Sequence, residues 1–347
     1  MIERFRQGLV AAMAAATSIV AHAAVSSPSW SVVDIGTLGG PGSYGAAVSD
    51  TGYVVGCADT PGGAAHAFLY DGRMHDLGTG GGDPNGNSCA LAVNDRGVAA
   101  GRSASGDLVV WSGSKVTAIG VKGSVGGIND SGTVVGSANA DGGTQPFVYA
   151  GGKVTMLGAS GEATAVNLRG QVVGTVAGRA FLYENGALRD LGTLGGFSSA
   201  KGLDDFGRVV GMSTDAHGTP YPFMWANGTM QAIPGPSGSS AIDIDDAGLV
   251  IGSAEGTHGY FLDGGTYTRL DTLPAVVQKG WRHLEPTGVN NRGWIVGTAT
   301  DSGGNLHAFL LMPLRRATTT AVEFGRSAGA PEVAALARLA RTSASVP

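Results

Sequence analysis

The chain has 347 residues, of which 60 are glycine, 43% are hydrophobic and 14% are charged. Gly-rich disordered chains lack this apolar content, so the composition excludes disorder and indicates many short strands joined by tight turns. The net charge is −5, and both ends are net positive, so the segment between them is more acidic than the whole chain. Nucleic-acid binding needs clustered Lys and Arg, and this balance argues against it.

The first 23 residues have the layout of a secretory signal peptide. Arg4 and Arg6 give a positive start, residues 9–21 are uncharged and mostly apolar, and Ala21-His22-Ala23 offers a small-x-small cleavage site. The apolar run is too short to span a bilayer comfortably, and no later stretch is long enough. We therefore expect residues 1–23 to be a signal peptide and the protein to be secreted, extracellular or periplasmic, without membrane insertion.

A nine-residue pattern recurs seven times along the chain. Its copies are VSDTGYVVG at 48–56, VNDRGVAAG at 93–101, INDSGTVVG at 128–136, VNLRGQVVG at 166–174, LDDFGRVVG at 203–211, IDDAGLVIG at 244–252 and VNNRGWIVG at 289–297. Each copy reads as a hairpin in which Ser, Asn or Asp caps a type I turn and the central Gly takes a left-handed position. The central glycines lie 35 to 45 residues apart.

Each repeat contains two further apolar strands. In the first repeat they are residues 67–70 and 74–78, with a Gly turn between them. Four short antiparallel strands in about forty residues are typical of one blade of a β-propeller. The sequence therefore predicts an all-β fold, a seven-bladed β-propeller over residues 24–314.

The ends of the repeat region distinguish a closed propeller from an open solenoid. The seventh repeat stops after its third strand, at residues 307–314, whereas residues 33–40 (VDIGTLGG) match the end of a fourth strand at residues 191–196. A solenoid would instead need capping units at both ends. We expect an N-terminal strand to complete the last blade, a 3+1 closure that leaves no exposed sheet edge between the ends.

The repeat unit joins Asn-Asp-x-Gly-x-Val-Val-Gly to His-Ala-Phe-Leu and Asp-Leu-Gly-Thr-Leu-Gly-Gly. It resembles the HAF-repeat family of extracellular bacterial proteins: His66-Ala67-Phe68 and His307-Ala308-Phe309 match the motif that names the family, and residues 190–196 match the last segment. The resemblance covers residues 32 to 312. It implies export and β-propeller-like repeats, and because the family carries no assigned activity it implies no catalytic residue.

The acidic pairs of the chain have a structural explanation. Asp204, Asp205, Asp243, Asp245 and Asp246 are expected in turn positions that other repeats fill with Asn or Ser. General acid–base catalysis would need two carboxylates that converge on one substrate. We assign these residues to turns and expect no catalytic residue.

The histidines also fit the fold better than a metal site. His66, His258 and His307 share one repeat position on three consecutive blades, where strand spacing places equivalent residues too far apart for one ion. We expect hydrogen-bonded structural histidines and no metal. The Gly-rich segments 78–86 and 192–196 lead into strands and not into a helix, so they predict no phosphate-binding site and no cofactor.

Two cysteines and two long connections are expected on one face of the propeller. Cys57 and Cys89 lie near the junction of the first two blades and form either a disulfide, which an exported protein can keep, or two structural thiols. The connections are residues 79–88 and 272–288, and long loops on a rigid scaffold often carry binding sites. The candidate ligand-binding residues are Asp83, Asn85, Asn87, Trp281, Arg282, His283 and Glu285. Solvated insertions without a site are the alternative.

Residues 315–347 differ in composition and predict a flexible tail with a short helix over 331–341. For the whole protein we expect an exported, non-catalytic binding or interaction module. Its partner would be carbohydrate or a surface protein. The alternatives are a secreted glycan-cleaving enzyme, for which the acids Glu162, Glu184, Glu255 and Glu285 are scattered, and a structural component of the cell envelope.

Overall fold

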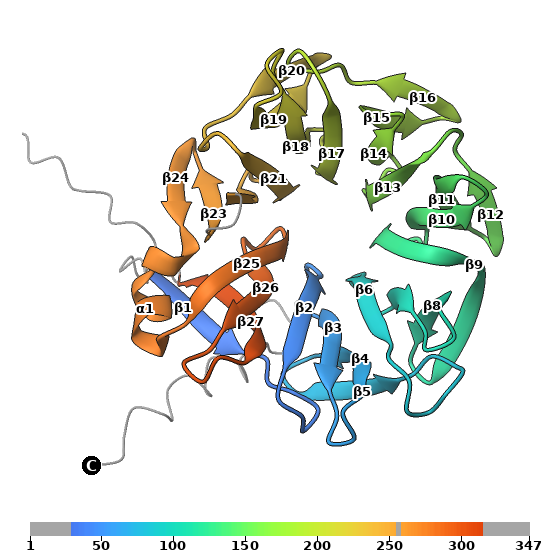
Figure 1. The fold of residues 1–347 in the computed structure, drawn as a ribbon, viewed down its shortest axis with the longest axis vertical. Helices are drawn as coiled ribbons and strands as arrows, with labels where there is room; N and C mark the ends of the chain where they lie inside the picture. Colours follow the sequence, from blue (N-terminus) through green and yellow to red (C-terminus); the bar gives the residue numbers. More distant parts are fainter. Residues whose placement is uncertain (1–28, 255–257, 315–347) are drawn as a thin grey trace, which may run out of the picture.

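The computed structural model describes residues 29–254 and 258–314. Within these ranges the chain forms 27 strands, one 3-10 helix and one α-helix. Figure 1 shows the sheets set in a ring around a centre, with the first strand of each repeat on the inside. The prediction of an all-β propeller is confirmed. The signal peptide expected at 1–23 and the tail at 315–347, with its helix at 331–341, lie outside the described residues.

Five sheets of the described part have four antiparallel strands each. In four of these sheets the strands follow the chain order. They are β2 (Ser43–Val48), β3 (Val54–Asp59), β4 (Ala65–Tyr70) and β5 (Met74–Gly78); β13 (Gly161–Val166), β14 (Val172–Val176), β15 (Arg179–Glu184) and β16 (Ala187–Asp190); β17 (Ser198–Leu203), β18 (Val209–Thr214), β19 (Pro220–Ala226) and β20 (Thr229–Ala232); and β21 (Ser239–Ile244), β22 (Val250–Ala254), β23 (His258–Asp263) and β24 (Thr266–Arg269).

The strands expected to form two separate blades are joined in one seven-stranded sheet. They are β6 (Cys89–Val93), β7 (Ala99–Arg102), β8 (Asp107–Ser112), β9 (Lys115–Ile128), β10 (Val134–Ala140), β11 (Gly143–Ala150) and β12 (Lys153–Met156). β9 has 14 residues and pairs with β8 through its first part and with β10 through its last part. The prediction of seven separate blades is therefore wrong: five four-stranded blades stand beside one larger sheet. The turn glycines Gly97 and Gly132 are only 35 residues apart here, which leaves no residues for a loop between the two predicted blades.

The fifth four-stranded sheet combines the two ends of the described chain. It contains β25 (Arg282–Val289), β26 (Ile295–Thr300), β27 (Leu306–Leu314) and, outermost, β1 (Ser29–Asp34). β1 pairs antiparallel with β27, from Ser29 opposite Leu314 to Asp34 opposite Phe309. Trp30 of β1 is buried in the core of this blade, so the strand is held by packing as well as by hydrogen bonds.

Each innermost strand contains a β-bulge at the same place, which the sequence did not reveal. The extra residues are Ala46, Leu91, Gly126, Thr164, Lys201, Ile242 and Thr287. The last Gly of the nine-residue pattern lies opposite this bulge. A Cβ atom at Gly136 would lie 2.1 Å from the backbone oxygen of Ser124, and one at Gly211 would lie 2.0 Å from that of Ser199. The pattern ends in Gly because the bulged strand fills the place of a side chain.

The turn after each innermost strand forms as predicted. The seven central glycines have φ between +69° and +101°, in the left-handed region. At Asn129 the side-chain oxygen accepts hydrogen bonds from the backbone N–H groups of Ser131 and Thr133, both at 3.1 Å. The side-chain amide of the same residue donates to the backbone oxygen of Asn167 in the next repeat, at 3.0 Å. Asn94, Asn167 and Asn290 make the equivalent bond to their neighbours. The turn residue therefore also joins one repeat to the next.

Replacing the amide of Asn129 by a carboxylate should weaken this junction. Asn129→Asp keeps an acceptor for the turn but removes the donor, so the buried Asn167 carbonyl keeps only the Gly170 N–H and loses one hydrogen bond, at a cost of about 1 kcal/mol. The reverse change, Asp245→Asn, adds a donor where the repeat lacks one and removes a buried charge, so it should stabilise the protein. Denaturant unfolding of wild type and both variants measures these changes in the free energy of unfolding. Equal stability of Asn129→Asp and wild type would contradict the role of the amide.

The histidine of the His-Ala-Phe motif binds the aspartate of the fourth strand. His66 Nδ1 lies 3.0 Å from Asp76, and His307 Nδ1 lies 3.0 Å from Asp34 of β1. The carboxylates also accept backbone N–H groups two residues further on, which fixes the turn. His258 Nε2 lies 2.8 Å from the hydroxyl of Tyr267. The prediction of hydrogen-bonded structural histidines is confirmed.

The connection expected as a long loop at 272–288 is a packed insertion. It contains η1 (Leu270–Thr272) and α1 (Pro274–Lys279), and β25 already begins at Arg282. Pro274 starts α1 and Gly280, with φ +70°, ends it. Leu270, Val276 and Trp281 are buried in the same core cluster as Trp30 of β1. The insertion therefore covers the side of the last blade, because its apolar residues need burial.

A disulfide joins Cys57 of β3 to Cys89 of β6, with Cα atoms 4.7 Å apart. The predicted pairing is present. It connects the second strand of one repeat to the innermost strand of the next, so it adds a covalent link between two sheets.

Candidate functional site

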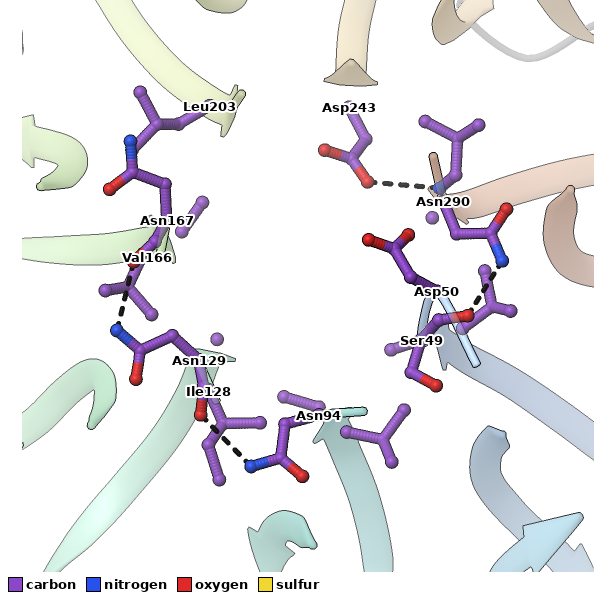
Figure 2. A pocket seen from close by; sticks show the side chains of 18 of the residues that line it. Ser49, Asp50, Asn94, Ile128, Asn129, Val166, Asn167, Leu203, Asp243 and Asn290 are labelled. Carbon is purple, nitrogen blue, oxygen red and sulfur yellow. Dashed lines mark hydrogen bonds between the residues drawn. The ribbon is translucent and has the colours of Figure 1, made fainter. Parts of the chain in front are cut away.

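A cavity of about 320 Å³ lies at the centre of the ring. All seven innermost strands contribute to its lining, each with the residues around its bulge and the first residues of the following turn. Figure 2 shows this circular arrangement, with turn residues such as Asn94, Asn129 and Asn167 along its edge. The repeats thus build one shared site that no single repeat contains.

The mouth of the cavity is acidic. The second turn residue of five repeats is an aspartate: Asp50, Asp95, Asp130, Asp205 and Asp246. These carboxylates accept backbone N–H groups of the preceding repeat. The N–H of Asp95 donates to the Asp130 carboxylate at 3.0 Å, and the N–H of Asp205 donates to the Asp246 carboxylate at 2.9 Å. Burial, together with the charges of Asp246 and Asp50, raises the pKa of Asp205 against the opposing effect of the Leu168 N–H. The assignment of Asp204, Asp205, Asp245 and Asp246 to turns is confirmed.

Asp243 is a correction to that assignment. It lies inside β21, directly after the bulge, and lines the cavity. The turn begins only at Asp245, two residues further along the chain, so Asp243 belongs to the strand. Its carboxylate accepts the backbone N–H of Val289 in the next repeat, at 3.1 Å, and that of Ile244 at 2.9 Å. Burial, with smaller effects of Asp245 and Asp50, raises the pKa of Asp243 to about 7 despite these hydrogen bonds.

Asp243 and Lys201 are exceptions within the repeat. The residues equivalent to Asp243 in the other repeats are Ala or Gly: Ala47, Ala92, Gly127, Ala165, Gly202 and Gly288. Lys201 is the only charged residue among the seven bulge positions. Its ammonium lies 2.9 Å from the carboxylate of Glu162 on β13. Since the fold is built without charge at these positions elsewhere, these two side chains are the strongest candidates for function.

At the level of the bulges, the charged residues of the cavity lie on one side. Lys201 and Asp243 come from the consecutive strands β17 and β21, and Glu162, the partner of Lys201, lies on the neighbouring strand β13. The bulges of β2, β6 and β9 contribute only small or apolar residues, namely Ala46, Ala47, Leu91, Ala92, Gly126 and Gly127. The cavity therefore has one polar, charged wall and one apolar wall.

Six of the seven residues predicted for the loop face are exposed on the surface. Asp83, Asn85 and Asn87 are exposed; Asp83 accepts the Asn85 N–H at 2.9 Å and Asn87 accepts the Ala65 N–H at 2.9 Å, so both shape the loop. None of the seven predicted residues lines the central cavity.

Trp281 is a core residue. Its side chain is 7% exposed and lies beside Phe309, so the expectation that it is presented to a ligand is wrong. Its neighbours Arg282 and His283 are exposed, and Glu285 is exposed within β25. The sequence missed the cavity because its residues are dispersed over seven repeats and become notable only when the bulges align them.

Among residues 29–254 and 258–314, no group of three or more His, Cys, Asp or Glu residues is placed to hold a metal ion. In the same ranges no helix is long and apolar enough to cross a membrane.

No family model and no curated protein matches the chain. Among solved structures, the WD40 β-propeller domain of Doa1 is similar with a TM-score of 0.51 and 14% identity, over 80% of this chain and 96% of that one. YCF48 bound to D1 peptide is similar with a TM-score of 0.47 and 12% identity, over 82% and 97% of the two chains. The Aleuria aurantia lectin in complex with α-methyl-L-fucoside is similar with a TM-score of 0.34 and 11% identity, over 82% of this chain and 91% of that one. The likeness to the Doa1 domain shows the propeller fold alone.

Proposed function

We propose that the protein is an exported, non-catalytic binding module that holds a small ligand in its central cavity. The observation that carries the proposal is the pair of charged residues, Lys201 and Asp243, at cavity positions where other repeats carry uncharged residues. A cavity of about 320 Å³ is within the ordinary size of small-molecule sites.

We propose further that the ring is closed by a 3+1 arrangement in which β1 completes the last blade. One observation supports it: β1 is the outer strand beside β25, β26 and β27. Membership of the HAF-repeat family is part of the same proposal, supported by the His-Ala-Phe to Asp contacts described above.

Export is supported by the residues 1–23 and by the disulfide between Cys57 and Cys89. Disulfides persist in oxidising compartments and are rare in the cytosol. Carbohydrate and a surface protein are retained as partner classes. The face with Asp83 and Arg282 is the alternative location for a protein partner.

The test is a binding screen on the full chain by thermal shift, with glycans and small polar metabolites. A ligand at a hundred times its Kd should add roughly 2.7 kcal/mol to stability. Binding should be lost in Lys201→Met and Asp243→Ala and kept in Asn85→Ala and Arg282→Ala, which alter the loop face. Loss only in the loop variants would place the site there, and no shift with any compound would contradict small-ligand binding.

A further inference from the structure

The carboxylates of the central cavity lack cationic partners. Seven aspartates line the cavity, and of these only Asp204 forms an ion pair within the described part of the chain, with Arg208. The other six form none there: Asp50, Asp95, Asp130, Asp205, Asp243 and Asp246. Lys201 is the one cation of the described lining, and its ammonium is already paired with Glu162 on β13. The cavity therefore carries negative charge that the protein itself does not balance.

The turns at the mouth do not require these charges. The Asp246 carboxylate accepts the N–H of Asp205 at 2.9 Å, and the neutral side chain of Asn291 accepts the N–H of Asp246 in the same way, at 2.8 Å. An amide thus serves the turn as a carboxylate does, without repulsion between like charges. Asp205 shows that repulsion, because burial and then the charges of Asp246 and Asp50 raise its pKa. The turn alone does not explain why five repeats carry an aspartate here.

Asp243 is an independent observation, since it lies inside β21 and not in a turn. Figure 2 shows it on the same side of the cavity as Asp50. Its carboxylate is partly buried and accepts only backbone N–H groups, from Val289 and Ile244. Holding a carboxylate away from bulk water costs free energy unless a cation pairs with it. Because the other repeats carry Ala or Gly at this position, packing does not require the group, and a cationic ligand would stabilise it.

The arrangement of the carboxylates limits the kind of cation. A metal ion needs several ligands that converge on one point, and none of the His, Cys, Asp and Glu residues that the structure describes form such a group of three. A quaternary ammonium favours an aromatic face, and the described lining contains no aromatic residue. A protonated primary amine instead offers N–H donors to separate carboxylates. Asp95, Asp130 and Asp246 each use Oδ1 for a backbone N–H, and their Oδ2 atoms accept no hydrogen bond within the described residues.

We propose that the central cavity binds a small organic molecule that carries a protonated primary amine. The amine donates to Asp243 and to carboxylates of the mouth, and the carbon skeleton lies against the apolar wall at Leu91 and Ala92. Lys201 uses one of its three donors for Glu162, so it can also donate to a hydroxyl group if the amine belongs to an amino sugar. This inference rests on the proposed function, since it names the ligand class of the same cavity.

The test is isothermal titration of the full chain with two matched pairs of compounds. D-glucosamine and N-acetyl-D-glucosamine differ in the charge of the amine, and cyclohexylamine and cyclohexanol differ in that charge without the sugar hydroxyls. In each pair the amine should bind roughly tenfold or more tightly than its neutral partner. Asp243→Asn should weaken binding of the amine by a similar factor and leave binding of the neutral partner unchanged. The matched control Asp263→Asn removes an exposed carboxylate and should behave as wild type.

The two amines distinguish the sources of the shared chemistry. Tighter binding of D-glucosamine than of cyclohexylamine would identify an amino sugar, and Lys201→Met should then weaken it. Tighter binding of cyclohexylamine would identify an alkyl amine.

Two results would overturn the inference. Equal affinity within both pairs would show that the charge of the amine is not recognised. If neither amine binds but a neutral glycan from the thermal-shift screen does, with loss in Asp243→Ala, the amine is rejected and the proposed function stands. No binding in either experiment would reject both.

Discussion

The protein should lose stability as the pH rises from about 4 to 8, and Asp243→Ala should remove most of that loss. The pKa of Asp243 is about 7 in the folded protein and close to the ordinary aspartate value of 3.8 in the unfolded chain. Between these values the folded state holds a proton that the unfolded state has released, so stability falls with rising pH. A difference of about three pKa units corresponds to on the order of 4 kcal/mol above pH 8.

Denaturant unfolding of wild type and Asp243→Ala at a series of pH values measures this effect as a difference. Other groups titrate in both proteins, so their contributions to the free energy of unfolding cancel in the difference. Examples are Asp205, whose pKa is raised by burial and by Asp246, and Asp271, whose pKa is lowered by the hydrogen bond from Arg269. The variant should gain relative stability steadily up to about pH 8. Asp263→Ala, which removes an exposed carboxylate, is the matched control. If the difference in free energy of unfolding between wild type and Asp243→Ala did not change with pH, the raised pKa of Asp243 would be refuted.

Removing the disulfide should cost about 4 kcal/mol. Cys57 and Cys89 are 32 residues apart, and a crosslink of that loop length lowers the entropy of the unfolded chain by roughly this amount. The double variant Cys57→Ala/Cys89→Ala should unfold at a correspondingly lower denaturant concentration.

Reductant provides the internal comparison. Dithiothreitol should lower the stability of the wild type to that of the double variant and leave the double variant unchanged. A wild type that is insensitive to reductant, and equal to the double variant without it, would mean that the two thiols are not joined in solution.

The local chemistry of the repeats could be predicted from the sequence. The turn at Asn129 and the hydrogen bond of His66 follow from residue types at fixed spacing, and the pairing of β1 with β27 agrees with the match between residues 33–40 and 191–196. The first two features depend on contacts between residues that are close within one repeat.

The errors came from contacts that no single repeat encodes. The fusion of two predicted blades through β9 depends on the shortness of one connection. The burial of Trp281 depends on apolar residues of η1 and α1 that need a surface to cover. Asp243 was placed in a turn because it was grouped with Asp245 and Asp246, although it lies two residues before the turn; that it lines the cavity depends on strands of several repeats.

The bulge and the Gly opposite it also bear on how such a chain can change through evolution. The two lie on strands joined by a short turn, so a duplication that copied only one of them would place a side chain against a backbone oxygen. The inner hairpin therefore has to be copied whole. The nine-residue pattern keeps its length in all seven copies, whereas the distance between copies varies from 35 to 45 residues because other connections differ in length.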